Sequence, residues 1–197
     1  MLKQWAIILG TLTLSPPALS AGAIQLEASS LPSFRGYALQ NKGTSFYFEG
    51  GSVTAAMMFP TTWNKINGSM GFYAQAVELT NKYTAEGVET LELFGGGLAI
   101  AVNYLTTPLR ASLSVGFMQG NLTQVGKRPV SQRYDSAASS SLGIGLTPLP
   151  GETGVILRAD YRVYALLRGT EKGDPEKRIA PQGFEGPAGV LGFVMGL

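Results

Sequence analysis

A chain of 197 residues predicts a single domain. Only 14% of its residues are charged, against about 25% in an average soluble domain, and its 26 glycines are nearly twice the usual share. This composition argues against a helical bundle and a solvated disordered chain, and the formal net charge of +2 is too small to indicate binding to nucleic acid.

Two residue types that the sequence lacks narrow the chemistry further. The absence of cysteine excludes disulfides, zinc–thiolate sites, thiol nucleophiles and a lipidated cysteine. The absence of histidine removes the commonest general base and the commonest metal ligand. We therefore expect no catalytic residue, no metal and no cofactor.

The first 23 residues have the features of a secretory signal peptide. Lys3 supplies the positive charge, WAIILGTLTL is the apolar segment, and SPPALSAGA offers small residues for cleavage after Ser20 or Ala23. The alternative, a membrane anchor, needs about 20 apolar residues, more than this segment contains. We expect residues 1–23 to be removed and residues 24–197 to form one exported domain, of bacterial type because it lacks cysteine.

Alternating apolar and small or polar residues predict strands along the rest of the chain. The predicted strands span about 23–30, 44–59, 69–80, 94–105, 110–120, 139–148, 153–168 and 186–197. One face of several strands is large and apolar, whereas the other consists of Gly, Ser and Ala. Small residues suit the crowded interior of a narrow barrel, while a soluble sandwich would carry Lys, Glu, Thr and Arg on its second face.

The connections between the predicted strands alternate in length. The polar segments 123–135 and 169–185 are long, whereas 106–110 and 147–153 are short. Outer-membrane barrels have this arrangement, with long outer loops and short periplasmic turns. The sequence thus predicts an all-β, antiparallel, up-and-down transmembrane barrel of eight strands. The alternative is a periplasmic or secreted soluble barrel that binds an apolar ligand, as lipocalins do.

The segment 123–135 carries a basic cluster. Lys127, Arg128 and Arg133 accompany a single acid, Asp135. These residues are candidates for surface contacts with lipopolysaccharide phosphates or with a host surface. The other interpretation is an ordinary solvated loop.

The seventh predicted strand, GVILRADYRVYALLRG, places Arg158, Asp160 and Arg162 on the face opposite its apolar series. In a barrel with apolar residues outside, these charges point into the lumen, with Glu27 and Glu49 as candidate partners from the first two strands. One interpretation is an ion path, a narrow pore or a ligand site. The other is a structural plug of ion pairs, which the sequence favours because the interior of an eight-stranded barrel is just filled by side chains.

The last strand alternates to the final residue, through Leu191, Phe193, Met195 and Leu197. This pattern resembles the C-terminal assembly signal of Gram-negative outer-membrane proteins, with Leu197 in place of the usual aromatic residue. The overall plan resembles the small barrels related to the OmpA membrane domain and OmpX. The resemblance implies a structural, adhesive or surface-interaction role, with outer-membrane lipid, lipopolysaccharide and the assembly machinery as partners.

Enzymatic members of such small barrels use a catalytic histidine, which this chain lacks. The sequence also contains no Ser-x-x-Lys and no Gly-x-Ser-x-Gly motif. We therefore expect a protein without enzymatic activity.

Overall fold

The computed structural model describes residues 22–38, 41–63, 66–84, 87–104, 107–126, 129–149, 152–172 and 174–197, and these form nine strands. The predicted signal peptide lies almost entirely outside them and remains a prediction. The strands are β1 (Ala23–Ala38), β2 (Asn41–Trp63), β3 (Ile66–Thr84), β4 (Gly87–Asn103), β5 (Leu109–Gly126), β6 (Val130–Leu146), β7 (Gly154–Glu171), β8 (Asp174–Ile179) and β9 (Gln182–Gly196).

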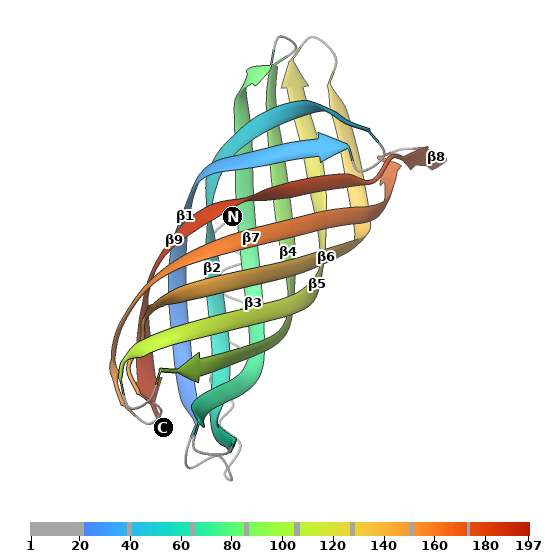
Figure 1. Ribbon diagram of the computed structural model, residues 1–197. Helices are drawn as coiled ribbons and strands as arrows, with labels where there is room; N and C mark the ends of the chain where they lie inside the picture. The colour runs from blue at the N-terminus through green and yellow to red at the C-terminus, as the bar shows by residue number, and fades with distance from the viewer. Residues whose placement is uncertain are drawn as a thin grey trace.

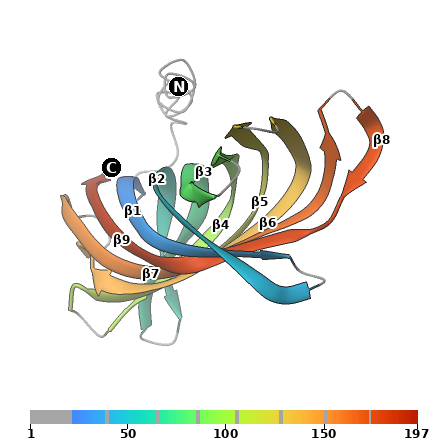
Figure 2. The same cartoon turned by 90° about the horizontal axis from the view of Figure 1, so that it is seen from above.

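Eight of these strands close into a barrel. Each of β1 to β7 pairs antiparallel with the next, β7 also pairs with β9, and β9 pairs with β1. The short β8 pairs only with the end of β7 and lies at the opposite end of the barrel from the C-terminus (Figure 1, Figure 2). The predicted eight-stranded, up-and-down antiparallel barrel is confirmed. No described segment forms a helix of the length and apolar character needed to cross a membrane.

Both ends of the described barrel wall meet at one rim, because Ala23 of β1 pairs with Gly196 of β9. The connections β2–β3, β4–β5 and β6–β7 lie at this rim, which we call the terminal end. The other connections lie at the opposite rim, which we call the distal end. The long, tilted strands run obliquely between the two rims (Figure 1).

The strands extend further toward the distal end than the sequence pattern predicts. Gln124 of β5 pairs with Val130 of β6, so most of the polar segment 123–135 belongs to two strands and not to a loop. The segment 169–185 likewise contains the end of β7, all of β8 and the start of β9. Polar residues on both faces of a strand hide the alternation, although the backbone ladder continues through them.

The outer face of the barrel carries a belt of large apolar side chains. Phe117 is 77% exposed and Leu157 is 53% exposed. On β4 the belt reaches from Phe94 to Tyr104, about eleven residues, and a tilted strand needs about 9–11 residues to cross a bilayer. Other members of the belt include Phe72, Leu98, Leu113, Val115, Leu142, Ile144, Leu191 and Phe193. A soluble monomer rarely exposes an apolar surface of this extent.

The interior has two zones of different chemistry. Toward the distal end, buried apolar residues form one cluster that includes Leu31, Phe34, Phe48, Leu79, Leu91, Tyr134, Leu166 and Phe184. Toward the terminal end, the buried residues are largely polar or charged, among them Gln25, Glu27, Ser52, Thr54, Arg110, Asp160 and Arg162. This polar zone holds the buried charged side chains of the lumen and is the candidate site.

Candidate functional site

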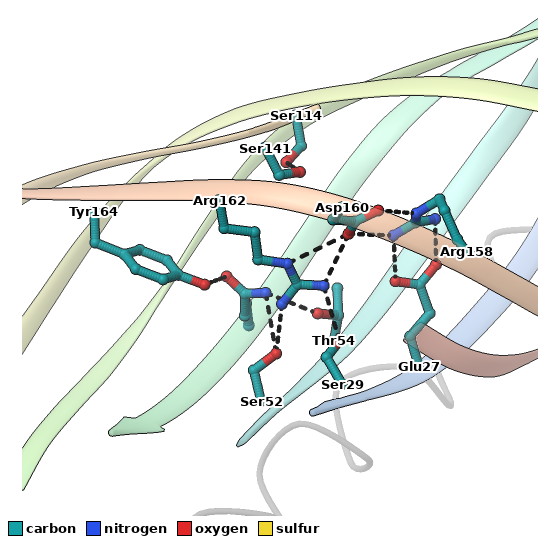
Figure 3. A network of polar contacts seen from close by, with 11 residues as sticks. Glu27, Ser29, Ser52, Thr54, Ser114, Ser141, Arg158, Asp160, Arg162 and Tyr164 are labelled. Carbon is teal, nitrogen blue, oxygen red and sulfur yellow. Dashed lines mark hydrogen bonds and ion pairs between the residues drawn. The ribbon is translucent and has the colours of Figure 1, made fainter. Parts of the chain in front are cut away.

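The candidate site is a network of ion pairs and hydrogen bonds on the inner wall of the barrel (Figure 3). Alternation along β7 turns Arg158, Asp160 and Arg162 toward the lumen. The side chain of Arg158 is 13% exposed, and those of Asp160 and Arg162 are 1% and 3% exposed. Charges so far from water need partners, because burying an unpaired charge costs on the order of several kcal/mol of folding free energy.

Asp160 lies between the two arginines and binds both. Arg158 donates from Nε to Asp160 Oδ1 at 2.6 Å and from Nη2 to Oδ2 at 3.1 Å. Arg162 donates from Nη2 and Nε to Asp160 Oδ2 at 3.0 and 3.3 Å. One carboxylate therefore organises two guanidinium groups that would otherwise repel each other.

Arg158 gains a second carboxylate from β1, on the other side of β9. Its Nη1 and Nη2 donate to Glu27 Oε1 and Oε2 of β1 at 3.0 and 2.9 Å. The guanidinium thus binds two acids through paired hydrogen bonds, the geometry that suits its planar group.

Arg162 completes its hydrogen bonding with hydroxyl groups. Nη1 donates to Ser52 Oγ of β2 at 2.6 Å, and Nη2 donates to Ser29 Oγ of β1 at 2.8 Å. These contacts connect β7 to two strands on the other side of β9 (Figure 3). The network therefore connects β7 to β1 and β2 on the inner side of the wall, and its donors and acceptors are paired with one another.

Uncharged side chains extend the network toward the distal end. Tyr164 donates its hydroxyl to Gln75 Oε1 at 3.3 Å, and Gln75 Nε2 donates to Thr54 Oγ1 at 3.1 Å and to Ser52 Oγ at 3.5 Å. The ring of Tyr164 stacks on Phe34, with ring centroids 5.9 Å apart. Tyr164 thus contacts both the polar zone and the apolar cluster on its distal side.

A glycine on β6 makes room for the network. A Cβ atom at Gly143 would lie 2.1 Å from Asp160 Oδ1, 2.9 Å from Ser112 Oγ and 3.0 Å from Arg158 Cδ. These distances are too short for any side chain. Gly143 is therefore required for the carboxylate of Asp160 to lie against the β6 wall.

The polar zone encloses a cavity of about 60 Å³. Its walls include the charged residues Glu27, Arg110, Arg158, Asp160 and Arg162, together with hydroxyl groups of β5 and β6. A water molecule needs about 10–15 Å³ by this measure, so the cavity has room for a few small molecules only. A second, larger hollow of about 810 Å³ is lined by residues of β1 to β6, and its lining includes the exposed residues Glu92, Phe94, Gln119 and Asn121 of the outer face. A lipocalin-type site for an apolar ligand would need a hollow of that size inside the barrel.

One predicted member of the lumen network lies elsewhere. Glu49 is exposed, on the opposite face of β2 from Ser52 and Thr54, so its prediction as an inward partner was wrong. The four others, Arg158, Asp160, Arg162 and Glu27, lie together in the structure.

The inward series of β7 also ends earlier than its sequence alternation suggests. Leu167 and Arg168 are both exposed, because the register of β7 against β6 shifts at this point. Arg168 therefore does not continue the row formed by Arg158, Asp160 and Arg162.

The predicted surface contacts of the basic cluster divide into two groups. Lys127 and Arg128 lie outside the described residues. Arg133 lies on β6 and not in a loop, and its exposed side chain forms an ion pair with Asp135 at 2.8 Å. At the tip beyond it, Lys177 of β8 contacts Glu171 at 2.5 Å, and this hydrogen bond raises the pKa of Lys177.

The predicted assembly residues occupy the outer face of β9. Leu191, Phe193, Met195 and Leu197 are each between 46% and 59% exposed and belong to the apolar belt. Leu191 and Phe193 lie opposite Ala28 and Leu26 of β1 at the closure of the barrel. Recognition of this strand by the assembly machinery remains a prediction.

The sequence analysis missed one buried charge. Arg110 is the second residue of β5 and lines the cavity, with 4% of its surface exposed. Its position has the same parity as Ser112 and Ser114, which the alternation already placed on the small, inward face. Extending that alternation by one step would have found it.

The comparisons with known proteins concern the fold alone. The chain matches no protein-family model and no curated protein. Among solved structures, neisserial surface protein A is 14% identical, with a TM-score of 0.51 over 89% of this chain and 97% of that one. Ail of Yersinia pestis, solved with the heparin analogue sucrose octasulfate, is 10% identical, with a TM-score of 0.49 over 88% and 97%. The expected resemblance to small outer-membrane barrels is confirmed at the level of the fold.

Proposed function

We propose that this protein is a non-enzymatic barrel of the bacterial outer membrane, with a lumen closed by its own side chains and a distal end that makes surface contacts. The observation that carries the proposal is the inverted polarity of the wall. Apolar side chains such as Phe117 and Leu157 cover the outside, whereas Arg158, Asp160 and Glu27 are paired inside. Such a wall suits lipid outside and a polar interior.

The closed lumen argues for a plug in preference to a narrow pore. Arg162 is 2% exposed and contacts β1, β2 and its own strand. The apolar cluster around Phe34, Leu79 and Phe184 fills the interior on the distal side of these contacts. The polar network and the apolar cluster both block the path of an ion through the lumen.

A non-enzymatic role is supported by the chemistry of the chain. Its sequence contains neither histidine nor cysteine. The two buried acids, Glu27 and Asp160, are committed to guanidinium partners and are poorly placed to accept a proton from a substrate.

The distal end supports the surface role. Its described strands carry exposed charges of both signs, including Arg133, Asp135, Asp174, Glu176 and Lys177. Lipopolysaccharide phosphates and charged surface polymers are the chemical classes that such a rim can contact. Both an adhesive role and a structural role at the cell surface would involve contacts made by this end of the molecule.

Location and orientation can be tested together because the chain has no cysteine. Two single-cysteine variants, Glu176→Cys at the distal end and Glu152→Cys at the terminal end, are treated in whole cells with a membrane-impermeant maleimide. Glu176→Cys is expected to label in intact cells, and Glu152→Cys only after the cells are broken. Recovery of the protein in the soluble fraction without detergent would contradict the membrane location.

The closed lumen has a separate test. Purified protein in planar lipid bilayers is expected to give no large, steady conductance. A stable open channel in the wild type would replace the plug with a pore.

A further inference from the structure

Arg110 is a buried cation that the ion-pair network does not neutralise. It is 4% exposed, and its guanidinium donates from Nη2 to Ser69 Oγ. Within the described part of the chain, two buried side-chain atoms have no hydrogen-bond partner: Nε of Arg110, and Oδ1 of Asn103, which lies opposite Arg110 on β4. Arginine keeps its charge at any accessible pH, so this group cannot become neutral by losing a proton.

The charges around the cavity do not balance. Its lining contains three arginines, Arg110, Arg158 and Arg162, against two carboxylates, Glu27 and Asp160, which leaves one positive charge in excess. Both carboxylates are held by Arg158 and Arg162. The excess charge therefore resides at Arg110.

Neutral hydrogen-bond donors surround the same space. Ser112, Thr147 and Gln25 line the same cavity as Arg110, and each can donate a hydrogen bond. Hydroxyl and amide donors grouped around a guanidinium suit an anion. The volume of about 60 Å³ admits a small inorganic ion with a few waters and excludes organic acids of any length.

We infer that the lumen binds one small inorganic anion of the halide class, chloride under physiological conditions, against the guanidinium of Arg110. The anion accepts a hydrogen bond from the free Nε and cancels the excess charge of the cavity. Water alone would satisfy Nε but would leave a net charge inside a lipid-enclosed wall, which is the costlier arrangement.

Bromide provides a direct test, since it has the chemistry of chloride and an anomalous X-ray signal. Crystals of the wild-type protein grown in sodium bromide are expected to show one anomalous peak in the lumen, in contact with the Arg110 side chain. An ordered water at that position, or a cavity without an anomalous peak, would overturn the inference.

Stability in solution provides a second test. The protein is refolded separately in sodium chloride and in sodium gluconate, whose anion is too large for the cavity, at the same ionic strength. The urea midpoint of the wild type is expected to rise with chloride concentration and not with gluconate, since a ligand that binds only the folded state stabilises it.

Two variants test whether the rise of the urea midpoint in chloride comes from an anion bound at Arg110. Arg110→Met is expected to abolish the difference between the two salts, whereas Arg133→Met, which removes an exposed arginine, is expected to retain it. An equal chloride effect in all three proteins would mean a general salt effect and would count against the site. If Arg110→Met does not fold, the bromide experiment on the wild type decides.

Discussion

Arg158 and Glu27 form a bidentate ion pair that reaches over an intervening strand. Arg158 lies on β7 and Glu27 on β1, and β9 separates these two strands in the wall. The pair therefore braces the seam at which the barrel closes, between the last strands and the first. A contact of this kind stabilises closure between β9 and β1, because a sheet that is open at this seam would hold the two side chains apart.

The first prediction concerns this pair. Glu27→Leu is expected to cost about 3–5 kcal/mol of unfolding free energy, because it leaves a buried guanidinium with one acid fewer. Glu27→Leu combined with Arg158→Met is expected to cost less than the sum of the two single changes. Urea titrations in lipid vesicles, followed by heat-modifiable gel mobility, measure both quantities.

A control for this cycle is Glu176→Ala. Glu176 is an exposed glutamate of the short β8 strand, so its loss is expected to change stability by no more than about 0.5 kcal/mol. Strict additivity of the Glu27 and Arg158 changes would show that the brace does not contribute to folding.

The second prediction compares two aspartates. Asp160→Ala removes the carboxylate shared by Arg158 and Arg162 and is expected to destabilise the barrel by about 3–5 kcal/mol. Asp174→Ala removes a residue of the exposed β8 strand and is expected to have little effect. Equal urea midpoints for the two variants would contradict a structural role for the network.

Much of the lumen face could be predicted because the side-chain period of a strand is two. The β7 sequence has apolar residues at every second position from Val155 to Leu167, so the opposite face is fixed once one face is assigned to lipid. Glu27 followed from the same argument on a strand with Gln25 and Ser29.

Glu49 could not be placed in this way. Around it, Phe46, Tyr47 and Phe48 are apolar at successive positions, and two glycines follow, so neither face of β2 is distinct in the sequence. Only the pairing with β1 and β3 shows that Ser52 and Thr54 point inward. The distal ends of the strands could not be predicted for a related reason. Where the strands leave the membrane, polar residues occupy both faces, so the alternation between apolar and polar residues is lost.

The third prediction contrasts the two faces of β7. Leu157→Arg places a charge in the apolar belt and is expected to cost about 2–4 kcal/mol near the bilayer midplane. A polar lumen at the neighbouring inward position would make Ile156→Ser cost much less. The structure instead buries Ile156 completely, in an apolar cluster with Ala23 and Val194.

Ile156→Ser is therefore also expected to be costly, by about 2–4 kcal/mol, since it exchanges a packed apolar side chain for a hydroxyl. The conservative change Ile156→Val should cost only about 0.5–1.5 kcal/mol. Folding titrations in vesicles that found Ile156→Ser as mild as Ile156→Val would place water, and not packed side chains, at the terminal end of the lumen.

The fourth prediction concerns Gly143, which lies under the carboxylate of Asp160. Gly143→Ala places a Cβ atom where Asp160 Oδ1 now lies, so the carboxylate must move and lose hydrogen bonds to the two arginines. The variant is expected to lose most of the stability that Asp160→Ala loses. Gly189→Ala is the control, because a Cβ atom there meets nothing within 4 Å.

Combining the changes separates this mechanism from simple crowding of the β6 wall. If Gly143→Ala acts by displacing Asp160, it should cost much less in a protein that already carries Asp160→Ala, and the two effects should be far from additive. Urea midpoints of the two single variants and the double variant measure this. A full additional loss in the double variant would mean that the alanine collides with Ser112 or with the backbone, and that the ion-pair network tolerates it.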